Sequence, residues 1–227
     1  MDSYLWVISN KEIIKIFYGL IITVICAIIV IKVDRLYRIS LHQGIRYLRN
    51  AFFFYGIGFL IRYLGGALLY YEFVHYDYLV MSLFEFFLIT AGFFLLYSLI
   101  WKKIETDKEE YLSSLLNGKI LVFYLIAISL VVLDYIWQSH YFMFFSQIIV
   151  FSLSSIVSLK NYKRNGIKHR FLLFYFIAMF FILAAWILNT LAALYFNWYH
   201  GILVNIYLLN IMVFLLFLYG VIKTTKS

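Results

Sequence analysis

The 227-residue chain contains no proline and only one cysteine. Proline is the usual helix breaker, so its absence removes support for transporter designs that depend on broken helices. The lone Cys26 excludes a disulfide within the chain and a site built from several thiolates. Charged residues make up only 13% of the chain, about half the share of a soluble domain. The chain is therefore not expected to fold as a soluble protein.

Apolar and aromatic residues are abundant instead, at 65% and 22% of the sequence, with a mean hydropathy of +0.92. A run of about 20 apolar residues is long enough to cross a bilayer as a helix. The sequence predicts an all-α fold, a polytopic bundle of seven transmembrane helices forming a single domain over residues 1–227. The expected spans are about 12–32, 48–71, 79–101, 119–137, 141–159, 171–194 and 202–222.

Most of the 19 basic residues lie in the loops after the first, third and fifth spans and in the tail. The positive-inside rule then predicts an N-terminus outside and a C-terminus in the cytoplasm of the cell membrane. We expect no cleaved leader, because the chain starts acidic and no small-residue cleavage site follows the first apolar run. The net charge of +8 is read as a topology signal, and nucleic-acid binding is not expected without a soluble basic face. Anionic lipid headgroups are the expected partners of the cytoplasmic loops.

Three charged residues, Arg62, Glu85 and Asp134, stand inside otherwise apolar spans. A charge in hydrocarbon costs several kcal/mol unless it is paired or hydrated, so such residues usually face a bundle interior. With a rise of about 1.5 Å per residue, six polar side chains fall at a similar depth in the outer half of the predicted bundle. This layer comprises Arg62, Glu85, Asp134, Gln147, Asn189 and Asn205.

Two interpretations of this layer remain open. The expected pair between Arg62 and Glu85 either fixes the register of adjacent helices or lines a pocket open to the outside. Gly58, Gly65 and Gly66 lie on the face of Arg62 and permit close helix approach. Alternatively, Asp134 lies at the membrane interface and extends its carboxylate toward water. The side chains of Gln147, Asn189 and Asn205 alternatively serve only to form hydrogen bonds between helices.

Each predicted outer loop carries one histidine, namely His75, His140 and His200. Together with Glu72 or Asp77 they suit zinc or copper, although no HxxxH spacing supports a metal site. Seven spans with an outer N-terminus are similar to microbial rhodopsins. Those need a lysine in the middle of the seventh span, where this chain has only Lys223 at the inner end. No cofactor, and in particular no retinal, is expected.

The sequence also contains a short internal repeat of one tripeptide pattern. Gly44-Ile45-Arg46 precedes the second predicted span, and Gly166-Ile167-Lys168 precedes the sixth, both from the inner side. This repeat allows a 3+1+3 arrangement in which spans one to three resemble spans five to seven. Such parallel repeats occur in small sugar carriers of the SWEET type, whose proline-hinged spans this chain lacks.

We expect a receptor-like, ligand-binding membrane protein that takes a small molecule from outside, because the polar layer is one-sided. A small transporter or ion-conducting protein is the first alternative and would need a polar route inward. An accessory subunit of a membrane complex is the second, with the amphipathic 102–118 loop as an interfacial helix or a docking site for a protein partner. An enzyme is not favoured, since no nucleophile–base pair is evident. The layout also resembles the seven-helix sensor regions that precede histidine kinases, a likeness of architecture only.

Overall fold

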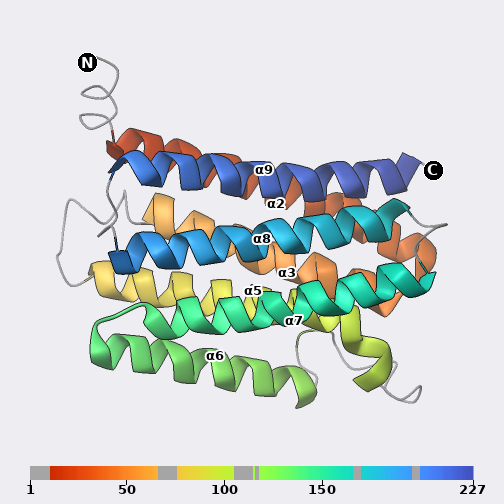
Figure 1. Cartoon of the computed structure of the whole chain (residues 1–227), viewed down its shortest axis with the longest axis horizontal. Coiled ribbons are helices and arrows are strands. Elements are labelled where there is room, and N and C mark those ends of the chain that lie inside the picture. The colour runs from red at the N-terminus through yellow and green to blue at the C-terminus, as the bar shows by residue number, and fades with distance from the viewer. Residues whose placement is uncertain are drawn as a thin grey trace.

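The computed structural model is helical over the residues it describes, which are 11–65, 76–104, 115, 118–165, 170–195 and 200–226. Side chains are described for 13–65, 78–101, 115, 118–164, 172–195 and 206–223. Seven helices run along the long axis of the molecule (Figure 1). They are α2 (Lys11–Ser40), α3 (Gln43–Leu60, continued by the π-helix η1, Ile61–Gly65), α5 (Tyr76–Ile104), α6 (Gly118–Trp137), α7 (Tyr141–Asn165), α8 (Arg170–Tyr195) and α9 (His200–Lys226).

Six of these helices are long and apolar enough to cross a membrane. The exception is α3, whose first half carries Arg46, Arg49 and Asn50. The chain is thus a multi-pass helical membrane protein in contact with lipid. The predicted interfacial helix at 102–118 falls mostly outside the described residues.

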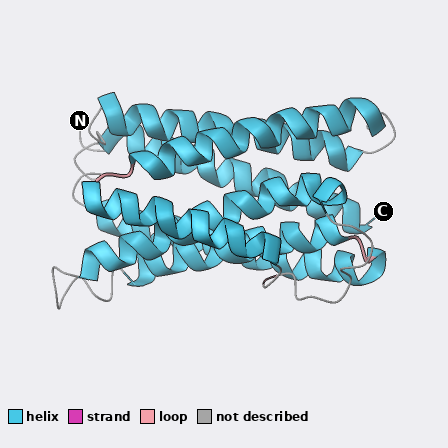
Figure 2. Cartoon of the chain, turned by 90° about the horizontal axis from the view of Figure 1, so that it is seen from below, coloured by secondary structure: helices cyan, strands magenta, loops and turns pink. Residues whose placement is uncertain are grey.

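Six helices close into a ring around the bundle axis. Along the ring α2 packs on α3, α3 on α5, α5 on α7, α7 on α8, α8 on α9, and α9 returns to α2. Helix α6 lies outside the ring against α5 and α7, at the lower edge of Figure 1. In the view turned by 90° the helices again run along the long axis of the molecule (Figure 2). Two sequential trios, α2–α3–α5 and α7–α8–α9, therefore meet at the α5–α7 and α9–α2 junctions, and α6 links them. These contacts are compatible with a 3+1+3 arrangement, while the resemblance of the two trios stays a prediction.

The core fills the inside of the ring with aromatic and aliphatic side chains. Phe52 of α3 makes edge contacts with Phe214 and Phe217 of α9, at ring-centroid distances of 6.0 and 5.0 Å. By contrast, α6 buries only Ile120, Ala127 and Asp134. Phe123 and Tyr124 pack partly buried against the core. Many other apolar side chains of α6 are exposed, as expected for a helix solvated by lipid.

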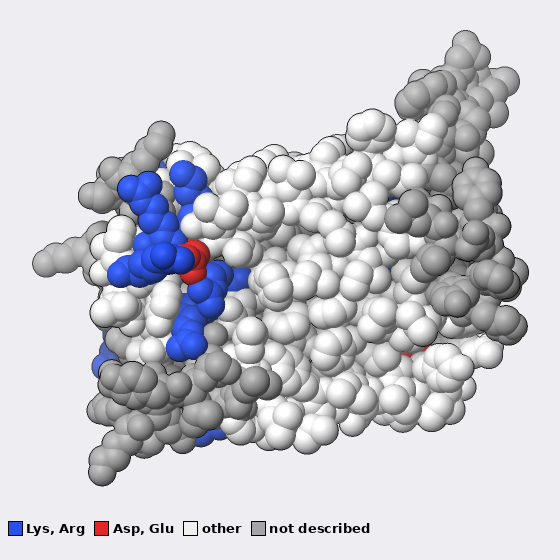
Figure 3. All heavy atoms as spheres, turned by 180° about the vertical axis from the view of Figure 1, so that it is seen from behind, with Lys and Arg blue, Asp and Glu red and all other residues white. Residues whose placement is uncertain are grey.

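Most of the described basic residues gather at one end of the bundle, and an uncharged band covers much of the length shown in Figure 3. Lys15 and Arg62 do not belong to this basic end. Asp34 joins the basic end by bonding Arg38 at 2.9 Å and Arg49 on the next helix. These bonds explain why α2 continues to Ser40 and does not end near residue 32, where the apolar run stops. The Asp34–Arg38 pair has the i,i+4 spacing that supports a helix.

Candidate functional site

A cavity of about 330 Å³ lies inside the ring. Every ring helix contributes to its wall, and α6 contributes no residue among those described. The wall uses the first half of α2, the end of α3 with η1, the start of α5, the start of α7, the second half of α8 and the middle of α9. The cavity therefore lies toward the end of the bundle opposite the basic end.

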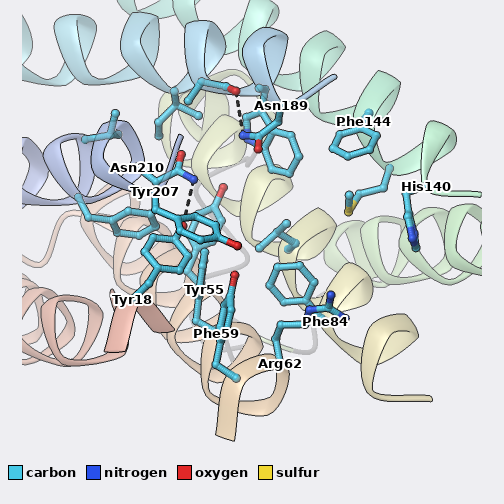
Figure 4. Close-up of a pocket in the computed structure, with 18 of the residues that line it drawn as sticks. Tyr18, Tyr55, Phe59, Arg62, Phe84, His140, Phe144, Asn189, Tyr207 and Asn210 are labelled. Atoms are coloured by element: carbon cyan, nitrogen blue, oxygen red, sulfur yellow. Dashed lines mark hydrogen bonds between the residues drawn. The ribbon is translucent and has the colours of Figure 1, made fainter. Parts of the chain in front are cut away.

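Aromatic side chains make much of the wall (Figure 4). Tyr18 of α2 stacks on Tyr207 of α9 with ring centroids 4.3 Å apart, and it meets Phe59 and Tyr63 edge-on. Phe59 in turn stacks on Tyr63. Such ring pairs add about 0.5–1.5 kcal/mol each beyond their buried area. The α9–α2 junction is therefore a rigid side of the cavity.

Two amides face the cavity from the second trio. Asn210 Nδ2 donates to the Tyr18 hydroxyl at 3.0 Å, which links α9 to α2. Asn189 Nδ2 donates to the backbone oxygen of Ala185 at 2.8 Å, one turn earlier on α8. The Asn189 side-chain oxygen has no hydrogen-bond partner among the described residues, so it is available to a ligand.

Arg62 reaches the cavity from η1, the π-helical turn that ends α3. Single π-helical turns are rare and occur frequently at functional sites. The Arg62 guanidinium contacts the Met81 sulfur. It also lies over the Phe84 ring, 5.8 Å from its centroid (Figure 4). No carboxylate within the described ranges forms an ion pair with it.

The expected pair between Arg62 and Glu85 is not formed. Glu85 Oε1 instead lies 2.5 Å from His140 Nδ1, in the turn before α7. The reason is helical direction, because successive residues point about 100° apart. Phe84 faces η1 and the cavity, whereas Glu85 points toward the α6–α7 turn. Arg62 and Glu85 thus have different partners, and their common depth stays a prediction.

Asp134 has a structural partner set of its own. Its carboxylate is buried and accepts hydrogen bonds from the backbone N–H groups of Phe142 and Met143, at 3.1 and 2.8 Å, and from the Ser139 hydroxyl at 3.2 Å. An acidic side chain at a helix N-terminus satisfies otherwise orphaned N–H groups and complements the helix dipole. Asp134 caps α7 and is not part of the cavity wall.

The remaining predicted residues fall into two groups. Gln147 is fully buried on α7, and both its side-chain polar atoms lack a partner in the described part of the chain. It packs on Gly92, where an added Cβ would lie 2.6 Å from Gln147 Oε1.

Asn205 and His200 lie on α9 with side chains outside the described set, and His75 lies outside it altogether. No cluster of three metal-ligating side chains occurs among the described residues, and His140 is bonded to Glu85.

Several residues of the cavity wall were not predicted from the sequence. Lys15 and Asn210 line it, as do Tyr18, Tyr207 and Trp186. Lys15 carries a usable signal, because it is a charge near the outer end of the first apolar run. The aromatic residues carry none, since similar residues also cover the lipid-facing surface.

The two alternative partners of Glu85 can be separated by double-mutant cycles. Glu85→Ala and His140→Ala should show a coupling energy of about 1.5–3 kcal/mol, the range for a hydrogen bond to a charged group. The cycle of Glu85→Ala with Arg62→Ala should give a clearly smaller coupling. Unfolding free energies in mixed micelles measure both cycles. A larger coupling energy between Glu85 and Arg62 than between Glu85 and His140 would show that Glu85 pairs with Arg62, as the sequence predicts.

Comparisons with known proteins give no match: no family model fits the chain, and neither the curated proteins nor the solved structures contain a significant relative.

Proposed function

We propose that the chain is an integral, receptor-like membrane protein that binds a small ligand in the cavity at the outer end of a seven-span bundle. α3 with η1 lies in the ring beside α2 and α5, which supports counting it as a span. Apart from Lys15 and Arg62, the described basic residues lie at the opposite end from the cavity. By the positive-inside rule we assign that end to the cytoplasmic side of the cell membrane. The N-terminus is then outside, and anionic lipid headgroups contact the basic end.

The observation that carries the proposal is the environment of Arg62. Its guanidinium faces a cavity, a thioether sulfur and a phenyl ring, with no carboxylate paired to it among the described residues. The nearby Glu85 is engaged with His140. A cation held in low-dielectric surroundings without an anionic partner is costly, and an anionic ligand would relieve that cost.

The wall also indicates the kind of molecule that fits. Lys15 adds a second cationic side chain to the lining, and the Asn189 oxygen offers an acceptor. Aromatic rings cover the sides of the cavity. Its volume of about 330 Å³ is near the lower end of the ~300–1,000 Å³ typical of ligand pockets. The ligand class is therefore a compact organic anion with an apolar or aromatic body.

Arg62→Gln should remove the preference of the cavity for an anionic ligand over a neutral ligand of the same shape. The probe is 4-iodobenzenesulfonate, whose iodine quenches the fluorescence of Trp186 in the cavity wall. Its neutral counterpart is 4-iodobenzenesulfonamide. In nanodiscs the natural protein should bind the sulfonate at least about tenfold more tightly, because a hydrogen bond to a charged group contributes about 1.5–3 kcal/mol. Arg62→Gln should bring the two affinities together.

The controls separate the cavity from the surrounding bilayer. Trp186→Phe should abolish most of the quenching, and Arg164→Gln, at the exposed end of α7, should leave the preference unchanged. Equal affinity for both probes in the natural protein, or a preference that survives Arg62→Gln, would rule out an anion site at Arg62.

A further inference from the structure

Deeper in the bundle than the cavity, four side chains that do not line it form a layer across the ring. The Ser98 hydroxyl of α5 and the Tyr175 hydroxyl of α8 are 2.7 Å apart. The Tyr175 ring meets Phe217 of α9 edge-on at 5.8 Å, and Phe217 meets Phe52 of α3 at 5.0 Å. We call Ser98, Tyr175, Phe217 and Phe52 the closure layer. It joins four of the six ring helices.

The polar contact in this layer spans the ring interior. α5 and α8 are separated along the ring by α7, so the bond between Ser98 and Tyr175 does not belong to the packing of neighbouring helices. The contribution of this bond to the stability of the closed layer is small, because a neutral hydrogen bond changes an equilibrium constant only a fewfold. The polar contact of the layer is therefore one that thermal motion can break.

Polar groups continue past the cavity along one buried face of α7. Gln147 lies about one turn deeper than the cavity residue Phe144, and Ser154, Ser155 and Ser158 follow on the same side. The Gln147 amide and the Ser155 hydroxyl have no hydrogen-bond partner among the described residues. Buried polar groups are normally satisfied, so unpartnered ones require an explanation. At a rise of about 1.5 Å per residue, Gln147 and Ser158 span roughly 16 Å toward the basic end.

The location of these groups is also informative. Gln147 packs on Gly92 of α5, at the α5–α7 junction where the first trio meets the second. Gly92 has no side chain, and the Gln147 amide occupies the space that one would take. Two trios that meet at two junctions can rock against each other, which is how repeat-built transporters alternate between sides.

We propose that the cavity is the outer half of a transport route and that the closure layer is its inner gate. When the Ser98–Tyr175 bond breaks and the α5–α7 junction opens, water and the solute reach Gln147 and Ser155 from the cytoplasmic side. The solute is the compact organic anion of the proposed function, on which this inference rests. No covalent step is involved.

Cysteine accessibility tests the gate without knowledge of the natural solute. In a Cys26→Ala background, Ser155→Cys is exposed to a charged, membrane-impermeant methanethiosulfonate in inverted vesicles. We expect labelling from the cytoplasmic side, and about fivefold faster labelling when Tyr175→Phe removes the bond across the layer. Ser98→Ala removes the same bond from the other side but leaves the Tyr175 hydroxyl 3.5 Å from the backbone oxygen of Leu95 on α5, so it should accelerate labelling less. The same direction of effect in both variants guards against a folding defect of one of them.

Two cysteine controls calibrate the labelling. Arg164→Cys, exposed at the basic end, should react from the cytoplasmic side in every background, which also tests the orientation. Ser129→Cys, on the lipid-facing side of α6, should stay unreactive in every background. Proteoliposomes should in addition take up 4-iodobenzenesulfonate faster with the natural protein than with Arg62→Gln.

The outcomes distinguish this inference from the proposed function. If Ser155→Cys stays unlabelled in all three backgrounds and no uptake occurs while the sulfonate still quenches Trp186, the transport route is wrong and the cavity is a one-sided binding site. If the gate variants accelerate labelling but the sulfonate neither binds nor enters, the gate is supported and the proposed ligand class is wrong.

Discussion

Replacing Asp134 with alanine is expected to lower the free energy of unfolding by about 3 kcal/mol. The substitution removes the acceptor of two backbone N–H groups at the start of α7 and of the Ser139 hydroxyl. Loss of a helix N-cap costs about 0.5–2 kcal/mol, and each buried group left unsatisfied adds about 1–3 kcal/mol. The effect is large because Asp134 is only 2% exposed, so water cannot easily take its place.

Unfolding in mixed micelles followed by circular dichroism measures this change. Asp134→Asn keeps one acceptor oxygen and should lose clearly less stability than Asp134→Ala. Ser139→Ala removes a single partner of the carboxylate and serves as the matched control, with an expected loss of under about 1.5 kcal/mol. Equal stability of Asp134→Ala and the natural protein would show that Asp134 does not cap α7.

Replacing Gly19 with alanine should both destabilise the bundle and disturb the cavity. A Cβ at Gly19 would overlap the Cβ and Cγ of Tyr63 and would lie 2.5 Å from its Cδ2. The overlapped atoms are at the root of the side chain and cannot swing aside, so η1 must shift. Overpacking of this kind costs about 1–3 kcal/mol. Tyr63 is next to Arg62, so the shift should also reduce the preference for 4-iodobenzenesulfonate over the sulfonamide.

Gly220→Ala is the matched control for this prediction. Gly220 is also a glycine within a long helix, but an added Cβ there would make only an ordinary contact with Phe174 at 3.4 Å. That variant should be as stable as the natural protein or slightly more so, because alanine is the better helix former. The same unfolding and quenching measurements apply to both variants. Full stability and an unchanged ligand preference in Gly19→Ala would contradict the close approach of α2 to η1.

The sequence by itself determined the class of protein and the position of the helices. Composition alone required a membrane-embedded helical protein, and six of the seven predicted spans meet the requirement of length and hydropathy. The α7 start at Tyr141 and the α6 end at Trp137 coincide with the predicted limits. These features follow from transfer of apolar segments into lipid, which depends on each segment alone.

The depth of polar residues can be predicted from the sequence, because rise per residue is fixed along a helix. It predicted that Arg62 and Glu85 lie at one level. It does not predict which way each side chain points around its helix. For this reason the sequence pairs Glu85 with Arg62, whereas in the structure the partner of Glu85 is His140. In the same way Asp134 was recognisable as an intramembrane charge, but its role as a cap depends on the tight α6–α7 turn.

Only the tertiary structure decided which residues share the cavity. Lys15, Tyr18, Trp186 and Asn210 come from three helices that are distant in sequence, and closure of the ring brings them together. It also decided that α6 stands outside the ring. In a chain that is apolar on nearly every face, hydrophobic periodicity cannot distinguish lipid-facing from core-facing sides, so helix order and rotation are set by packing between side chains that the sequence does not pair.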